Sequence, residues 1–160
     1  MLGMDTQYTI EIDRPAAEVW SILSDDFASI GDFLTAVPAS RSNGDPNSRT
    51  CETPYRGFSE VTETIIERDH EAMTYTYVAS SVPKWIGTPK NTWFVEEIDE
   101  HRCRAGFRPE IQATAFGKVV LRFASFSQDG FADGVLEDLK YFAEHGTPSP
   151  AKIASLAKRS

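Results

Sequence analysis

The stretch IEIDRPAAEVWSILSDD, residues 10–26, joins a strand pattern to a helix pattern with almost no linker. Apolar and polar residues alternate over residues 8–12, which predicts a strand with one buried face. Pro15 suits the first turn of a helix, where a missing backbone N–H costs nothing. The apolar residues that follow have helical spacing: Ala16, Val19, Trp20 and Leu23. A second short helix is predicted over 27–33, so two short helices follow the first strand.

Six more β-rich runs follow, and turn signals divide them into three pairs. Asn43-Gly44, the polar run 68–71 and Asp99-Glu100-His101 are the predicted turns. The runs are 36–41 with 48–53, 58–67 with 72–80, and the two halves of 91–110. The middle of the chain is therefore predicted to be a meander of about six strands.

The C-terminal third changes to helical spacing, with apolar residues at intervals of three and four: Phe131, Val135, Leu139 and Phe142. Gly146, followed by Pro148, is a strong helix stop. Residues 116–126 fit a helix or a strand, and 127–130 predict a break. We expect one domain over 1–146 and a tail over 147–160. The tail is expected to be a solvated arm with a short helix, with docking on a partner as the alternative.

Composition disfavours several classes of partner. The 160 residues carry a net charge of −8, and an acidic surface repels phosphate backbones and anionic lipids. No apolar run reaches the roughly 18 residues that a membrane span needs, and no signal-peptide pattern is present. Cys51 and Cys103 are too few for a disulfide framework, which predicts free thiols in a reducing cytoplasm. We expect a cytoplasmic protein that binds no nucleic acid and has no stable membrane insertion.

The sequence contains no motif for a metal or a cofactor. His70 and His101 lie in predicted turns and His145 ends a predicted helix, so we expect surface roles for all three. The run ERDHE, residues 67–71, gathers ligand-type residues, but on a tight turn their side chains diverge. We expect neither a metal nor a cofactor.

The turn at 99–101 predicts the register of the hairpin within 91–110. Trp93 is expected opposite Phe107, on an apolar face. Glu96 is expected opposite Arg104, on a face that suits solvent. This hairpin therefore predicts one covered face and one exposed face.

The hairpin of 58–67 and 72–80 has a more polar predicted inner face. With a two-residue turn at 69–70, the opposed pairs are Tyr75 with Thr64, Tyr77 with Thr62, and Ala79 with Glu60. A one-residue shift in register puts Glu63 in the place of Glu60. A packed core excludes unpaired polar groups, so this face predicts a roomy interior with a few polar anchors, typical of a small-molecule pocket. The alternative is that this face is exposed to solvent.

Three segments resemble one known superfamily. IEIDRPAAEVWSIL resembles the opening strand and helix of the START-related, birch-pollen-allergen-like (SRPBCC) superfamily. SRTCETPYRGFSEVTETIIERDHEAMTYTYVASSVP resembles its middle, and GVLEDLKYFAEHG resembles its closing helix. The resemblance spans about residues 7–146 and is strongest to the bacterial polyketide cyclase/dehydrase and lipid transport group. The stretch 111–130 is longer than the usual link in this superfamily.

The resemblance implies an α+β helix-grip fold, in which a curved antiparallel sheet of about seven strands surrounds a long C-terminal helix. It also implies a hollow that binds lipids, polyketides or aromatic molecules. We therefore predict that the protein binds a small hydrophobic ligand. The predicted ligand-binding residues are Glu60, Thr62, Tyr75, Tyr77, Trp85, Trp93 and Phe107. Trp85 is expected either to act as a flap over the cavity mouth or to fold back on the sheet edge.

Two alternatives remain open at this stage. The first is a polyketide cyclase/dehydrase-type enzyme, in which burial would raise the pKa of Glu60 as a general base and Tyr77 would donate to an enolate oxygen. The second is a regulatory protein that binds a partner through the tail or a sheet edge. The sequence leaves both a monomer and a homodimer open.

Overall fold

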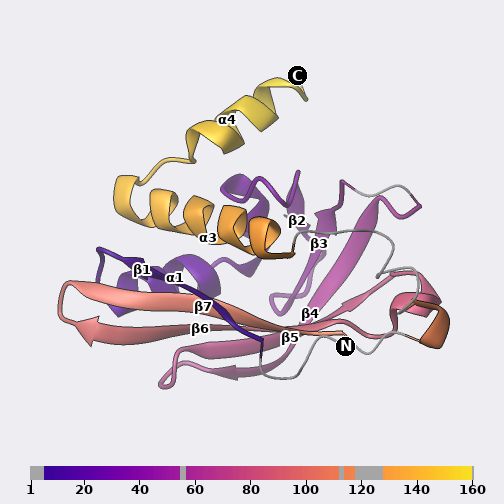
Figure 1. Cartoon of the computed structure of the whole chain (residues 1–160), viewed down its shortest axis with the longest axis horizontal. Helices are drawn as coiled ribbons and strands as arrows, with labels where there is room; N and C mark the ends of the chain where they lie inside the picture. Colours follow the sequence, from indigo (N-terminus) through magenta and orange to yellow (C-terminus); the bar gives the residue numbers. More distant parts are fainter. Residues whose placement is uncertain (1–5, 55–56, 112–113, 118–127, 160) are drawn as a thin grey trace.

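The computed structural model describes residues 6–54, 57–111, 114–117 and 128–159. This part of the chain forms an α+β fold, in which a curved antiparallel sheet of seven strands has the order β1-β7-β6-β5-β4-β3-β2 (Figure 1). The strands are β1 Tyr8–Ile12, β2 Ser40–Ser42, β3 Ser48–Glu52, β4 Glu60–Asp69, β5 Thr74–Ser80, β6 Lys90–Asp99 and β7 Arg102–Glu110. The helix-grip fold expected from the resemblance is confirmed.

Helices α1 and α3 and the 3-10 helix η1 lie against one face of this sheet. The α-helices are α1 Ala16–Ser24, α3 Gln128–His145 and α4 Pro150–Ala157, and the 3-10 helices are η1 Phe27–Asp32 and η2 Lys84–Ile86. Helix α3 lies across the sheet near β1 and α1 (Figure 1). Most of the predicted segment 116–126 lies outside the described residues. Within the described ranges, no helix is long and apolar enough to cross a membrane.

The opening stretch forms the predicted strand and helix. All four apolar residues of the predicted helix face are buried: Ala16, Val19, Trp20 and Leu23. Strand β1 pairs with β7, almost one hundred residues away in sequence. The chain must leave this position at once, because α1 packs on the neighbouring strands β6 and β7, and η1 then packs on β2 and β3 at the other edge of the sheet.

The strand register was predicted correctly for one of the two long hairpins and wrongly for the other. In β6–β7 the predicted register is confirmed, with Trp93 opposite Phe107 and Glu96 opposite Arg104. In β4–β5 it is wrong, because Tyr77 faces Ile65 rather than Thr62.

The wrong register has two local causes. The turn takes up four residues rather than two, since Asp69 pairs directly with Thr74. The carboxylate of Asp69 accepts from the N–H groups of Glu71 and Ala72, and Met73 has a φ of 54°. A bulge between Ile65 and Glu67 then shifts the register again.

The core lies between α1, η1, α3 and the inner face of the sheet. Val135 and Leu139 of α3 are buried as predicted, and Phe142 stacks on Phe33 with ring centroids 4.7 Å apart. Phe131 is 45% exposed, so its predicted place in the apolar face is wrong. The buried face of α3 also includes Leu136, which the simple spacing of three and four did not include.

The C-terminal tail packs on the domain that precedes it. It contains the predicted short helix, α4, but the expectation of a solvated arm is wrong for its first turn. The Lys152 side chain is 0% exposed, and its Nζ donates to the carbonyls of Leu34 and Val37 at 2.9 Å. Ser149 caps α4 and donates to Asp138, whose carboxylate also accepts from the Thr35 N–H.

Candidate functional site

A charged pair lies inside the fold, on the inner face of β3 and β4. Arg49 is 2% exposed and lies directly opposite Glu63. Its Nε and Nη2 both lie 2.6 Å from the same Glu63 carboxylate oxygen, and its Nη1 donates to the Phe27 carbonyl at 2.8 Å. The guanidinium also covers the Phe27 ring, 3.8 Å from the centroid. Arg49 is therefore held on several sides before any ligand is present.

Burial and the neighbouring groups shift the pKa of Arg49 in opposite directions. Burial lowers the pKa of Arg49, but the Glu63 carboxylate, together with smaller contributions from Tyr75, Tyr77 and Cys51, outweighs it, so the pKa is raised and the guanidinium stays charged. The Cys51 thiol donates to the same Glu63 carboxylate at 3.7 Å. Burial, followed by the negative charge of Glu63, raises the pKa of Cys51 to about 12. The thiol is therefore neutral at ordinary pH.

Two tyrosines of β5 lie next to this pair and face inward, as the sequence predicted. The rings of Tyr75 and Tyr77 lie 5.6 Å and 6.1 Å from that of Phe27, centroid to centroid. Burial raises the pKa of the Tyr75 hydroxyl to about 12, and it raises the pKa of Tyr77 further. Both phenols are therefore neutral donors near pH 7.

Two buried polar atoms of this group lack a partner among the residues that the structure describes: Tyr75 Oη and Asn91 Oδ1. We call them the open polar atoms. Arg49 opposes the rise in the Tyr75 pKa through its charge and as a neighbouring hydrogen-bond donor, but within the described residues no group meets the distance and angle of a hydrogen bond with Tyr75 Oη. The other end of the Asn91 amide donates to Tyr77 Oη at 3.1 Å. An unpaired buried polar atom costs about 1–3 kcal/mol, so native proteins contain few of them.

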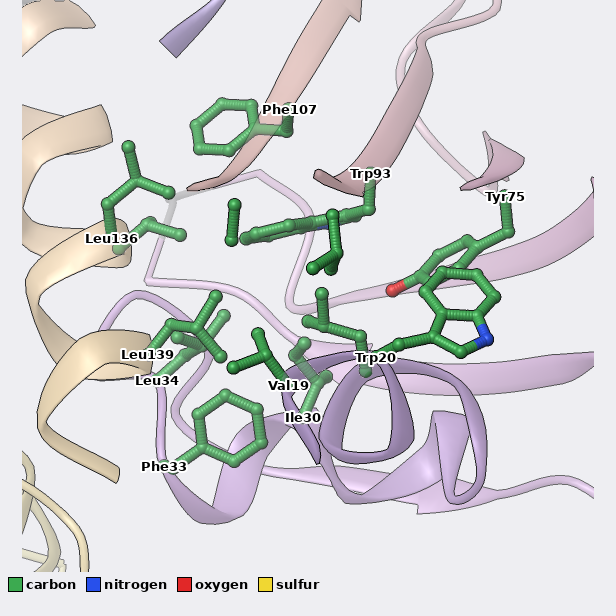
Figure 2. Packing of buried hydrophobic residues seen from close by; sticks show 14 of the residues in the cluster. Val19, Trp20, Ile30, Phe33, Leu34, Tyr75, Trp93, Phe107, Leu136 and Leu139 are labelled. Carbon is green, nitrogen blue, oxygen red and sulfur yellow. The ribbon is translucent and has the colours of Figure 1, made fainter. Parts of the chain in front are cut away.

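Aromatic side chains continue the inner face toward β7. Trp93 is buried beside Phe107, with ring centroids 5.0 Å apart, and Tyr75 contacts Trp20 at 5.7 Å. Figure 2 shows Trp93 and Phe107 on neighbouring strands facing α3, and the Tyr75 hydroxyl pointing into the cluster. The structure therefore brings together four of the predicted residues: Tyr75, Tyr77, Trp93 and Phe107.

Glu60 and Thr62 do not lie in this group. Strand alternation puts both on the side opposite to Glu63, and the Glu60 side chain is 45% exposed. The hydrogen bond from Arg41, at 2.8 Å, lowers the pKa of Glu60. The expectation that Glu60 is buried with a raised pKa is therefore wrong. Glu63 takes the inward position opposite Ala79 instead, as in the alternative, although the partner of Ala79 moves by three residues from Glu60 rather than by one.

Trp85 lies in η2, just after β5. Its side chain is half-buried, and its carbonyl accepts from the Thr114 N–H and hydroxyl at 3.1 Å and 3.2 Å. These bonds tie η2 to the segment beyond β7. The described contacts do not join Trp85 to the tyrosines, so its predicted role as a flap stays a prediction.

Arg49, Asn91 and Phe27 are members of the group that sequence reasoning missed. Arg49 and Cys51 are two residues apart on β3, so both point to the same face of the sheet. That spacing indicates an inward arginine only once the pairing of β3 with β4 shows which face is inward. Asn91 and Phe27 gave no signal in the sequence.

The cysteines and histidines match the expectations for them. Cys51 and Cys103 are free and buried in the described part of the chain. His70 is exposed, although its Nδ1 accepts from the Trp20 indole N–H at 3.2 Å. Across residues 6–54, 57–111, 114–117 and 128–159, no group of three His, Cys, Asp or Glu side chains could hold a metal ion.

The family of the chain follows from its sequence. Residues 4–144 match the family described as polyketide cyclase / dehydrase and lipid transport. The chain belongs to this family. No curated protein matches the sequence.

Solved structures of several kinds share the fold at low sequence identity. XoxI from Bacillus cereus has a TM-score of 0.67 and 19% identity, covering 84% of this chain and 92% of that one. The ZhuI aromatase/cyclase from Streptomyces sp. R1128 has a TM-score of 0.67 and 14% identity, covering 90% and 98%. Norcoclaurine synthase from Thalictrum flavum, in complex with dopamine and hydroxybenzaldehyde, has a TM-score of 0.64 and 14% identity, covering 82% and 83%. At these identities the likeness shows the fold alone.

Proposed function

We propose that the protein binds a small hydrophobic ligand, aromatic or polyketide in type, between the sheet and the helices. The ligand would carry an oxygen-containing group that meets the open polar atoms. The observation that carries this proposal is the presence of those two atoms among aromatic side chains on the inner face. A core under selection for stability alone would avoid them, whereas binding sites combine apolar walls with a few polar anchors.

The family and the fold support this proposal. The family description names polyketides and lipids, and norcoclaurine synthase, which has a similar fold, is in complex with two small aromatic molecules. In the proposed site Trp93 and Phe107 form an aromatic wall, and Tyr75 and Asn91 orient the ligand's oxygen. Trp85 is retained as an entrance residue, since η2 directly follows the strand that carries both tyrosines.

Titration calorimetry with 2-naphthol and with naphthalene tests the proposal. The two probes have the same ring system and differ by one hydroxyl group. We expect 2-naphthol to bind about tenfold more tightly, because one hydrogen bond is worth about 1–1.5 kcal/mol. Tyr75→Phe should remove most of this difference and leave the affinity for naphthalene unchanged. Absence of binding by either probe, together with no co-purified small molecule in native mass spectrometry, would contradict the proposal.

A second candidate function is a cyclase/dehydrase-type enzyme that transfers a proton on a bound polyketone. The observation that favours it is the inward position of both Glu63 and Tyr77 on adjacent strands. A neutral buried phenol can donate to a developing enolate oxygen. Glu63 replaces Glu60 as the carboxylate of this hypothesis, although one of its oxygens is already occupied by Arg49.

Turnover of a linear poly-β-ketone tests the second candidate. If the site is catalytic, Tyr77→Phe should reduce turnover by about 10²-fold or more while the affinity for the substrate changes little. Equal loss of turnover and affinity would favour a binding role instead. Glu60→Gln is the control, because it changes an exposed carboxylate on the outer side of β4, the strand that carries Glu63.

A further inference from the structure

We propose that the interior site selects neutral ligands over anionic ones, and that Glu63 is the residue that sets this preference. The inference rests on the proposed function and names the charge class of its ligand. It follows from the ion pair on the inner face, in which the Glu63 carboxylate neutralises Arg49.

The one fully buried cation of the group, Arg49, is already neutralised. Two of its nitrogens lie 2.6 Å from Glu63, a third donates to the Phe27 carbonyl, and its face covers the Phe27 ring. A carboxylate ligand would therefore have to compete with Glu63 for Arg49. It would also lie near the negative charge of Glu63 in a region of low dielectric constant.

Apart from that ion pair and Arg68, the described ionisable groups nearest the open polar atoms are neutral. The Tyr75 and Tyr77 phenols and the Cys51 thiol are protonated at pH 7, and burial raises the pKa of each of them further above that value. An anion brought there would lose its hydration without gaining a counter-charge, whereas a hydroxyl or carbonyl group would gain hydrogen bonds at a much smaller desolvation cost.

A second cation faces the same strand and provides the competing explanation. Arg68 lies opposite Tyr75, and its Nη1 donates to Asn47 Oδ1 at 3.1 Å. Its Nε is buried and lacks a partner within the described ranges. Of the two open polar atoms, Tyr75 Oη belongs to the residue opposite Arg68, whereas Asn91 pairs with Tyr77 on the other side of the bulge. The Arg49 guanidinium lies over the Tyr77 ring, 5.2 Å from its centroid. A ligand that contacts both open polar atoms therefore lies beside the Arg49–Glu63 pair, and Arg68 is the competing cation that the test has to exclude.

Calorimetric titration at pH 7 with 2-naphthol and 2-naphthoate tests the inference, since the first is neutral and the second is a carboxylate. For the wild-type protein we expect 2-naphthol to bind at least tenfold more tightly. Glu63→Gln leaves Arg49 without its counter-charge, so the affinity for 2-naphthoate should rise at least tenfold. Glu60→Gln, the control on the outer side of the same strand, should change neither affinity.

The double variant Arg49→Gln/Glu63→Gln separates the charge of Arg49 from the shape of the site. It removes both charges, so it should keep the wild-type preference for 2-naphthol. If Glu63→Gln fails to fold, the affinities of the wild-type protein and the double variant for the two probes still test the inference. Thermal unfolding of each variant shows whether it is folded.

Three results would overturn the inference. They are equal or tighter binding of 2-naphthoate by the wild-type protein, no gain for 2-naphthoate in a folded Glu63→Gln variant, and 2-naphthoate binding that Arg68→Gln abolishes. Each of them leaves the proposed function standing, because a ligand still binds. Only a failure of both probes to bind would contradict the proposed function itself.

Discussion

The two ends of the inner face of the sheet have opposite chemistry. Around β1, β6 and β7 the inward side chains are mostly apolar and pack against α1 and α3. Around β3, β4 and β5 the same face carries the Arg49–Glu63 pair and two tyrosines, one of which has an open polar atom, and the other open polar atom belongs to Asn91 at the start of β6. Burial of the apolar side chains at the first end stabilises the fold, whereas burial of the polar groups at the second end carries a desolvation cost. The packed core lies at the first end, and the proposed ligand contacts lie mainly at the second.

The largest expected effect comes from breaking the buried pair. Arg49→Leu should lower the free energy of unfolding by about 3–5 kcal/mol, because the Glu63 carboxylate and the Phe27 carbonyl lose their partner inside the protein. Arg41→Leu breaks the exposed pair with Glu60 and should change stability very little. Urea unfolding measures both. Equal losses would mean that the polar end is no more buried than the protein surface.

The apolar end should respond through loss of packing. Leu139→Ala should cost about 3 kcal/mol, since the Leu139 side chain of α3 is fully buried in the core and its truncation leaves a cavity. Phe131→Ala on the same helix should cost far less, because Phe131 is 45% exposed. Urea unfolding of the two variants compares them directly. If Phe131→Ala proves the more damaging, α3 is rotated relative to the arrangement described here.

The two tyrosines of the polar end should respond differently from each other. Tyr77→Phe removes the acceptor of the Asn91 amide and should cost about 1–2 kcal/mol. Tyr75→Phe removes an open polar atom and should leave stability unchanged or slightly raised. Thermal unfolding of the ligand-free variants distinguishes them. A clear loss in Tyr75→Phe would show that its hydroxyl already has a partner, and the proposed ligand contact would then lack its basis.

High pH should weaken the polar end. The pKa of Tyr75 rises from 10.0 to about 12 on folding, so between these values the unfolded chain loses the proton first. The native state then binds more protons than the unfolded state, and stability falls as pH rises through this window. For Tyr75 alone the loss between pH 10 and pH 11 should be about 1 kcal/mol. The measurement is the difference between wild-type and Tyr75→Phe unfolding curves at these two pH values. A parallel decline in both would contradict burial of this hydroxyl.

The sequence predicted most of the fold because its signals are local. Alternation in residues 8–12, helical spacing in residues 16–23 and a tight turn at 99–101 each determine structure within a few residues. The site was predicted in part. Tyr75 and Tyr77 were placed inward correctly, because alternation along one strand does not depend on its partner.

The errors arose where one segment had to be aligned with another. Glu60 and Glu63 differ by three positions, so they lie on opposite faces, and only the register of β4 against β5 decides which one is inward. A four-residue turn and a bulge set that register, and neither has a clear sequence signal. Burial of Lys152 depends in the same way on backbone carbonyls more than one hundred residues away.

The sequence by itself determined the order of strands and helices, the family and the inward direction of the aromatic residues on β5 and β6, because short-range periodicity encodes them. Tertiary structure alone decided that Arg49 meets Glu63, that Asn91 bonds to Tyr77, and that the tail returns to residues 34–38. These contacts join segments whose alignment depends on turn length, bulges and packing across the whole sheet. The functional proposals rest on that second group of contacts.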